Sequence, residues 1–301
     1  MKKKIPDVAA IGEILWDIFP DTKCLGGAPF NVVCNTTRLG MKGSIVSSVG
    51  HDLLGMEILD AVEREGVSAE CIKVNPRFPT GTVSVSLDDK GKPSYVINEN
   101  TAWDHLEWNE NIGLLTRKCD AVVFGSLAQR SPSTRRLILR FLRQRYKKSC
   151  LRVFDINLRK PHIDRTIIMN CFPLIEILKL NDDEFAIIGN MLNARGDTDK
   201  TIKILMEDYG IPFIAVTRGD KGSLLIRDGK VSNHPGYKVD VVDTVGAGDA
   251  FTAAIIVGAL KGKSLDEIND NANRLASYVC TQRGALPPIP ESIKKLFSSQ
   301  S

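Results

Sequence analysis

The chain has 301 residues, of which 43% are hydrophobic and 25% are charged, and its formal net charge is +4. These proportions are those of a globular protein with enough chain for one large domain or two small ones. A net charge this small does not indicate a protein that binds nucleic acid or a membrane surface. No run of about 18 apolar residues is present that would span a membrane.

The seven cysteines are odd in number, scattered along the chain, and contain no CxxC pair. This usage indicates a reducing compartment rather than a disulfide framework or a zinc site. Lys2, Lys3 and Lys4 precede an apolar stretch, as in a signal peptide, but Asp7 and Glu13 interrupt that stretch. We therefore expect the protein to be cytoplasmic.

The first part of the chain alternates apolar runs with turn signals. Residues 8–12 are a continuous apolar run, which is typical of a strand buried on both faces. Gly26 and Gly27 stand before Pro29, a residue suited to the first turn of a helix. The elements expected here are a strand at 8–12, a helix at about 29–39, a strand at 44–49 and, after a turn at 50–55, a helix that reaches about residue 65.

A hairpin with a different pattern follows. Residues 82–87 alternate strictly between polar and apolar, residues 88–91 read as a turn, and residues 94–97 read as a second strand. This pattern predicts a half-buried antiparallel hairpin, which fits poorly into a parallel core. We therefore expect residues 13–43 and 72–104 to contribute a small β-sheet lid that projects from the main body and covers a cleft, beside an α/β core from residues 1–12, 44–71 and 105–301.

From about residue 112 strands and helices alternate, which predicts a doubly wound, mainly parallel sheet flanked by helices. Its strands are expected at 121–124, 151–156, 175–180, 213–217 and 223–226. Ligands bind at the carboxyl ends of such strands. Polar segments follow the strands at 155–159, 181–184 and 217–222, and at a Gly-Ala-Gly turn. Asn, Asp and Gly also favour ordinary turns, but their repetition along one edge favours an anionic ligand with a divalent metal.

The Gly-Ala-Gly turn at 246–248 lies between a predicted strand at 237–242 and a predicted helix with apolar residues at helical spacing. Backbone amides at such a turn can converge on an anion. Asp249 stands in the first turn of that helix, where we expect it to stay ionised and to accept a proton from a hydroxyl. An anion hole beside a base suits phosphoryl transfer. Ordinary helix capping is the alternative.

Two other glycine motifs are excluded. The dinucleotide-binding pattern needs a third glycine where Phe251 stands, which disfavours an oxidoreductase. Gly262-Lys263-Ser264 imitates the end of a P-loop, but Val257 stands where the partner glycine would be.

Residues 243–251, with the sequence DTVGAGDAF, resemble the C-terminal signature of the ribokinase-like (PfkB) family of carbohydrate kinases. Residues 50–55 resemble part of the family's N-terminal signature, and the resemblance covers nearly the whole chain. It implies a ribokinase-like fold and transfer of a phosphoryl group from ATP to a sugar hydroxyl. It also implies Mg²⁺ and a monovalent cation such as K⁺ as cofactors.

The resemblance assigns roles to individual residues. Asp249 would be the general base, and the anion hole would be formed by Gly246, Ala247 and Gly248. Arg159 would be a charge clamp near the transferred group, with a structural ion pair as the alternative. The nucleotide-binding residues implied are Asn181, Thr217, Arg218, Gly219, Gly222 and Asn273. The cation-binding residues implied are Glu184, for Mg²⁺ through water, and Asp243, for the monovalent cation together with carbonyl groups near residues 279–284.

The sugar-binding residues implied are Asp17, Gly26, Gly27, Asn31, Asp104 and Asn157. Segments 26–31, 102–104, 124–127 and 155–159 look most like bacterial fructokinases, which implies conversion of fructose to fructose 6-phosphate. Phe30 and the pair His162-Ile163 depart from that pattern and would reshape the sugar pocket. The alternatives are a 2-keto-3-deoxygluconate kinase, a ribokinase or nucleoside kinase, and, from a different class, a catalytically silent sugar sensor. A homodimer through the exposed lid strands is also expected.

Overall fold

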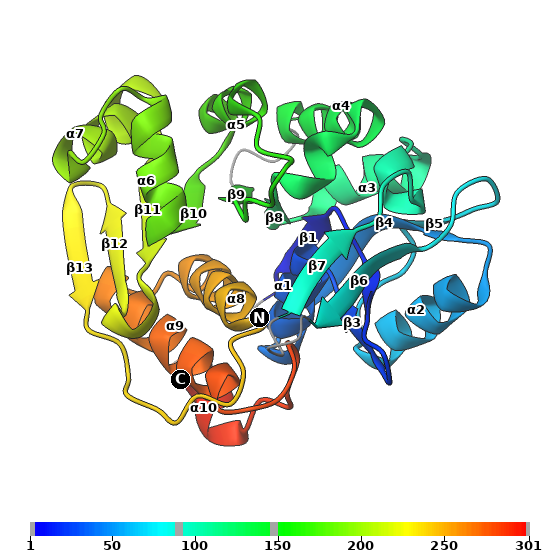
Figure 1. Ribbon diagram of the computed structural model, residues 1–301. Helices are drawn as coiled ribbons and strands as arrows, with labels where there is room; N and C mark the ends of the chain where they lie inside the picture. The colour runs from blue at the N-terminus through cyan, green and yellow to red at the C-terminus, as the bar shows by residue number, and fades with distance from the viewer. Residues whose placement is uncertain (1–3, 88–92, 145–149, 299–301) are drawn as a thin grey trace.

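The computed structural model describes residues 4–87, 93–144 and 150–298. Its main feature is a nine-stranded sheet between two layers of helices (Figure 1). Across the sheet the strands are β13 (Lys230–His234), β12 (Ser223–Arg227), β11 (Phe213–Thr217), β10 (Ile177–Asn181), β9 (Leu151–Asp155), β8 (Ala121–Phe124), β1 (Asp7–Ile11), β4 (Lys42–Gly50) and β5 (Ile72–Asn75). Only the pairs β11–β12 and β12–β13 are antiparallel, which confirms the expected doubly wound, mainly parallel sheet.

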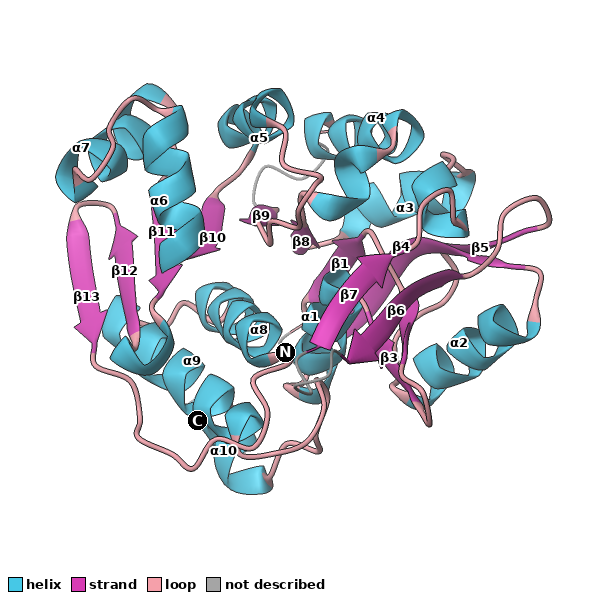
Figure 2. Ribbon diagram, viewed as in Figure 1, coloured by secondary structure: helices cyan, strands magenta, loops and turns pink. Residues whose placement is uncertain are grey.

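Helices cover both faces of this sheet (Figure 2). One layer holds α1 (Ala28–Arg38), α2 (Leu53–Arg64), α8 (Ala247–Leu260), α9 (Leu265–Cys280) and the short α10 (Glu291–Leu296). The other holds α3 (Glu110–Lys118), α4 (Pro132–Arg143), α5 (Arg165–Cys171), α6 (Asp182–Met191) and α7 (Thr198–Lys203). Short 3-10 helices lie at Ala102–His105, Leu127–Arg130, Phe172–Leu174 and Gly219–Lys221, and a π-helical turn lies at Ile204–Asp208. Within the described residues, no helix has the length and apolar character needed to cross a membrane.

Two apolar cores result, one on each face of the sheet. The first surrounds α8, in which residues 250–258 are all buried. A helix that is apolar on every side packs in the interior, and α8 lies between α1 and α9. The second core contains Phe124 and Phe154, whose rings stack with centroids 4.8 Å apart. The start of α8 is thereby held beside the carboxyl ends of the central strands.

A separate four-stranded sheet has the order β3 (Lys23–Gly26), β2 (Leu15–Ile18), β6 (Gly81–Leu87) and β7 (Pro93–Ile97) (Figure 1). Strands β6 and β7 pair in antiparallel fashion, as predicted, whereas β2 and β6 run parallel. The predicted turn at 88–91 lies outside the described residues. Leu15 and Val83 form a small apolar cluster of their own in this sheet, apart from the two large cores.

One expectation about strands needs correction. The predicted strand at 237–242 is wrong, because that segment has no strand pairing and follows β13 as a loop. Its β-branched residues Val241 and Val242 are more than half exposed, so strand propensity there meets no partner strand. Within residues 13–43 and 72–104, β2, β3, β6 and β7 form the small sheet, whereas β5 pairs with β4 and α1 packs on α8.

A buried ion pair joins the small sheet to the core. Arg130 donates to both carboxylate oxygens of Asp104 at 2.8 Å, and it donates to the carbonyl of Asn98, just after β7, at 2.6 Å. The side chains of the pair are 7% and 5% exposed. The guanidinium carbon lies 4.2 Å from the ring centroid of Trp103. The end of β7 is thus fixed to the second helical layer.

Arg130→Met should lower the free energy of unfolding by about 3–5 kcal/mol, because it leaves the carboxylate of Asp104 buried without its counter-charge. Chemical denaturation monitored by circular dichroism measures the change. Lys203→Met is the matched control, since Lys203 and Glu207 lie 3.9 Å apart with side chains 70% and 64% exposed. That substitution should change stability by less than about 1 kcal/mol. Equal, small effects of the two substitutions would contradict the assignment.

Candidate active site

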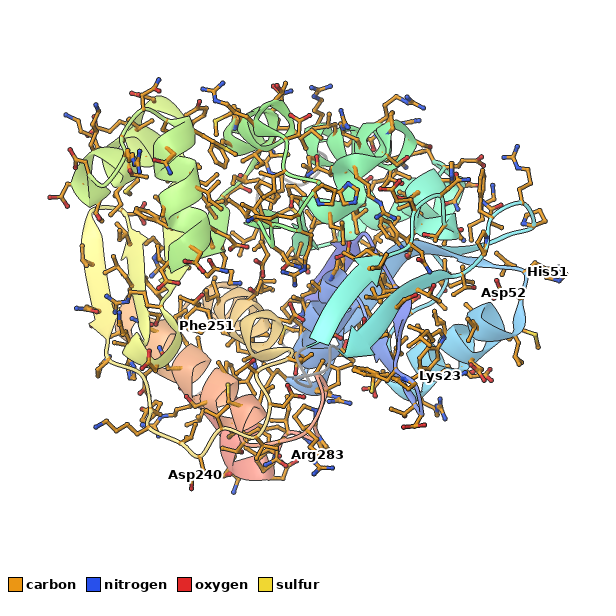
Figure 3. The ribbon with its side chains drawn as sticks, viewed as in Figure 1. Lys23, His51, Asp52, Asp240, Phe251 and Arg283 are labelled. Carbon is orange, nitrogen blue, oxygen red and sulfur yellow. The ribbon has the colours of Figure 1, made fainter. Side chains whose placement is uncertain are left out.

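The first turn of α8 is the centre of the candidate site. Gly246, its N-cap, has φ of 79°, and a Cβ atom there would lie 2.5 Å from the carbonyl oxygen of Ala285. Only glycine fits this position. The backbone amides of the first turn have no partners within the helix, and together with the helix dipole they favour an anion. Phe251, further along the helix, is 2% exposed and anchors α8 in the first core (Figure 3).

Asp249 lies in this first turn, and Asn31 of α1 donates to its Oδ2 atom at 2.8 Å. Burial raises the pKa of Asp249 to about 7, and the neighbouring charge of Asp155 adds to the rise. The hydrogen bond from Asn31 and the charges of Lys179 and Arg159 act in the opposite direction. Burial therefore acts against the expectation that the helix terminus keeps this carboxylate ionised, because the loss of hydration opposes the helix dipole.

The polar residues that follow the parallel strands do line one edge of the sheet. Asn181, at the end of β10, lies in register with Thr217, at the end of β11. Lys179 lies in register with Asp155 on β9, and the Lys179 Nζ atom is 3.1 Å from Asp155 Oδ1. The hydroxyl of Thr252 in α8 lies 2.7 Å from Asp155 Oδ2. These contacts join the strand ends to the first turns of α8.

Glu184 is a buried carboxylate at the start of α6. Its two oxygens accept hydrogen bonds from the backbone amides of Leu158 and Asn181, at 2.9 and 2.8 Å, and burial raises its pKa. Among the described residues, no group of three or more His, Cys, Asp or Glu side chains is arranged to hold a metal ion. A carboxylate oxygen that accepts one hydrogen bond keeps a lone pair for a metal-bound water. The donor set therefore fits Mg²⁺ bound largely through water, which this ion tolerates.

On the sugar side, Asp17 lies on β2 opposite the start of α1. A Cβ atom at Gly26 would lie 2.6 Å from Asp17 Oδ2, and one at Gly27, where φ is 111°, would lie 2.4 Å from the carbonyl oxygen of Glu13. Both glycines therefore allow a close approach of backbone and side chain. A shallow crevice beside them is lined by Ala28, Pro29, Val32, Val123, Phe124, Gly125, Asp155 and Asn157.

Asp104 differs from the other sugar-side residues because its carboxylate already has partners. It accepts from Arg130 and from the backbone amide of Thr101, at 3.0 Å, and its side chain is 5% exposed. The Nη1 atom of Arg130 is buried without a hydrogen-bond partner. The Nε1 atom of Trp103, over whose ring the guanidinium lies, is also buried without a partner, so Arg130 and Trp103 both have an unused hydrogen-bonding atom here.

On the nucleotide side, two predicted residues are engaged within the protein. The guanidinium of Arg218 donates to the Ser223 carbonyl at 2.9 Å and to Asn233 Oδ1 at 2.6 Å, which supports the β12–β13 hairpin. The amide of Asn273 donates to Ser223 Oγ at 2.7 Å and is buried between α9 and β12. A Cβ atom at Gly222, where φ is 77°, would lie 2.1 Å from the carbonyl oxygen of His234. The loop of residues 217–222, which includes Gly219, is thereby packed against the hairpin.

Asp243 joins two loops near the start of α8. Its carboxylate oxygens accept from the amides of Val245 and Gly284, each at 3.0 Å. Its own amide lies 3.2 Å from the Cys280 carbonyl. The carbonyl-rich segment 279–284 is therefore held beside Asp243, as the predicted cation site requires.

Arg159 lies in the loop after β9 and is exposed. Burial raises the pKa of Glu13, Asp17 and Asp249, and the positive charge of Arg159 opposes that rise at all three carboxyl groups. The guanidinium therefore lies within electrostatic reach of both the sugar side and the base.

Sequence reasoning missed two charged residues of this site. Glu13 follows β1, is 2% exposed, has no hydrogen-bond partner at Oε2, and burial raises its pKa to about 7. Lys179 lies within the otherwise apolar strand β10 and is 7% exposed. A lone charge inside or directly after an apolar strand was the available signal, since Lys and Glu are almost never fully buried unless paired.

Comparison with known protein families matches residues 20–292 to the family described as pfkB family carbohydrate kinase. A protein from Pyrococcus horikoshii named as a sugar kinase is 31% identical over 92% of this chain and 91% of its own. A fructokinase from Escherichia coli is 27% identical over 94% of this chain and 96% of its own.

Solved structures give the same fold. The Pyrococcus horikoshii protein in complex with ATP is 29% identical to this chain, with a TM-score of 0.77 over 92% of this chain and 93% of that one. A double mutant of fructokinase from Vibrio cholerae, solved with fructose, ADP and a potassium ion bound, has a TM-score of 0.81 over 99% of both chains. Its identity is 22%, so this second likeness concerns the fold alone.

Proposed function

This chain belongs to the pfkB family of carbohydrate kinases, and on that premise we propose that it transfers the γ-phosphoryl group of ATP to fructose, giving fructose 6-phosphate. The observation that carries the proposal is the position of Asp249, in the first turn of α8 and hydrogen-bonded to Asn31. A base and the backbone amides of the first turn then share one helix terminus. This pairing suits a reaction in which a hydroxyl loses a proton while a phosphoryl group gains negative charge.

In the proposed reaction, the acceptor hydroxyl gives its proton to the carboxylate of Asp249. A pKa raised to about 7 makes this carboxylate a stronger base than an ordinary aspartate. The amides of the first turn, at Gly246, Ala247 and Gly248, would stabilise the charge on the transferred group. Arg159 would add its positive charge on the open side of the site.

Fructose is the favoured acceptor because a polyol needs several fixed hydrogen-bonding groups. Asp17, Asn31 and Asn157 supply side chains for this purpose, and Gly26 and Gly27 allow the backbone to approach closely. The likeness to a named fructokinase over 94% of the chain supports the same choice.

ATP would lie along the carboxyl ends of β10 and β11, where Asn181 and Thr217 are in register. The loop of residues 217–222 would contact its phosphates, and Asn273 would support the nucleotide pocket from behind β12. Glu184 would hold Mg²⁺ through water, and the bound ion would neutralise charge on the phosphates. Asp243, with the carbonyls of 279–284, would hold a monovalent cation beside the first turn of α8.

We also propose that the protein forms a homodimer through the lid. Strands β3 and β7 are the two edges of the small sheet, and an edge strand carries unpaired backbone groups that another chain can cover. Light scattering during size-exclusion chromatography should give the mass of two chains. A mass equal to one chain, 33.1 kDa, at micromolar concentration would rule this proposal out.

A panel of acceptors with ATP and Mg²⁺ tests the proposed reaction. Release of ADP should be fastest with fructose, and ribose, 2-keto-3-deoxygluconate and a nucleoside should each give a lower kcat/KM. A faster reaction with one of these would replace fructose as the substrate. Thermal stabilisation by a sugar without any release of ADP would instead indicate a sensor.

Asp249→Asn should lower kcat by roughly 10²–10⁴-fold, the usual contribution of a positioned base, while ATP binding stays largely intact. Asparagine keeps the shape and the contact with Asn31 but cannot take the proton. Steady-state kinetics and calorimetric titration with ATP measure the two effects. Near-normal turnover of this variant would show that Asp249 is not the base.

A further inference from the structure

A buried ammonium group lies directly against the first turn of α8. Lys179 is 7% exposed, and its only neighbour of opposite charge within 4 Å, among the described residues, is Asp155 on the adjacent strand. A Cβ atom placed on Gly248 would lie 3.3 Å from Lys179 Nζ. A buried lysine is costly unless its charge is used or compensated, so its place beneath the proposed anion hole calls for an explanation.

Asp155 connects this lysine to α8. Its Oδ1 atom lies 3.1 Å from Lys179 Nζ, and its Oδ2 atom lies 2.7 Å from the hydroxyl oxygen of Thr252. The same hydroxyl oxygen is 3.0 Å from the carbonyl oxygen of Gly248. A chain of contacts therefore runs from β10 through β9 to the helix turn that carries Asp249.

The charges around Lys179 do not balance. Burial alone would lower the pKa of this lysine, but three carboxyl groups raise it above its ordinary value: Asp155 on β9, Glu184 on α6 and Asp249 on α8. Arg159 and Glu13, from the loops after β9 and β1, also face the site, and the Arg159 charge lowers the Asp249 pKa. The one buried ammonium of Lys179 therefore interacts electrostatically with three carboxyl groups. Of these, only Asp249 is proposed to exchange a proton during catalysis.

We propose that Lys179 is a positioning residue for phosphoryl transfer, in which its ammonium holds Asp155 against α8 and supplies the fixed positive charge that favours the ionised carboxylate of Asp249. This inference rests on the proposed kinase reaction and assigns to Lys179 a role that neither the anion hole nor the base supplies. Asp155 acts in the opposite direction, because its negative charge disfavours ionisation of Asp249. The two members of the ion pair therefore set the proton affinity of the base between them.

This role differs in a measurable way from that of an ion pair that only stabilises the fold. Removal of either member of such a pair would lower activity or stability, but the pH profile would not shift in a direction set by which charge was removed. A charge that acts on Asp249 must instead move the acidic limb of the kcat/KM profile, upward in pH when the cation is removed and downward when the carboxylate is removed. The direction of the shift therefore separates the two roles.

The experiment measures kcat/KM for the accepted sugar from pH 5.5 to 9 in Lys179→Met, Asp155→Asn, the double variant and the wild type. Dividing each profile by that of the wild type removes the titration of ATP, which is common to all. Lys179→Met should shift the acidic limb upward by about one pH unit, and Asp155→Asn should shift it downward. The double variant should fall between them.

Thr252→Val is the matched control, because it removes the hydrogen bond to Asp155 and changes no charge. It should lower kcat by at most about tenfold and leave the acidic limb where it lies in the wild type. Circular dichroism establishes that each variant is folded. If Lys179→Met does not fold, the double variant still tests the lysine, since its acidic limb should lie at higher pH than that of Asp155→Asn.

Two outcomes in an active enzyme would overturn the inference and leave the kinase assignment intact. Either the acidic limb of the kcat/KM profile stays at the same pH in all variants, or it shifts in the same direction in Lys179→Met and Asp155→Asn. A wild-type protein that releases no ADP with any sugar would overturn the proposed reaction itself, and the inference with it. The two failures are therefore distinguishable in one set of measurements.

Discussion

The removal of a carboxylate from water at the start of a helix is the constraint on which the site depends. Asp249 lies where a helix dipole and free amides favour negative charge, yet burial dominates and raises its pKa to about 7. The neighbours that oppose this rise come from three other segments of the chain: Asn31 on α1, Lys179 on β10 and Arg159 after β9. The proton affinity of one residue therefore reports the correct assembly of helix, strand and loop around it.

The architecture explains why these segments meet. In the large sheet the chain order reverses beside β1, with β8 on one side and β4 on the other, and such a reversal opens a crevice at the strand ends. Asp155, at the end of β9, lines the crevice described above, and the hydroxyl of Thr252 in α8 lies 2.7 Å from its Oδ2 atom. Members of one fold family can thus keep the crevice and vary the acceptor by changing the small sheet above it.

The sequence allowed the strands and the helix terminus to be predicted, because both have local causes. Strands β1, β8 and β11 are continuous apolar runs, and the glycine pair at 246 and 248 marks a turn that side chains would block. Pairing is not local, which is why residues 237–242 read as a strand but find no partner. The contact of Lys179 with Asp155 joins residues 24 positions apart, and only the register of β9 with β10 places them together. For the same reason, the sequence could not predict that Arg130 donates hydrogen bonds to both carboxylate oxygens of Asp104.

The tie between Arg130, Asp104 and Asn98 has a mechanical consequence. A contact whose loss costs several kcal/mol is too strong to open and close in every catalytic cycle, so residues 98–104 must travel with the core as one rigid body. Any movement of the small sheet relative to the core therefore begins beyond Asn98, and the end of β7 next to Asn98 stays fixed.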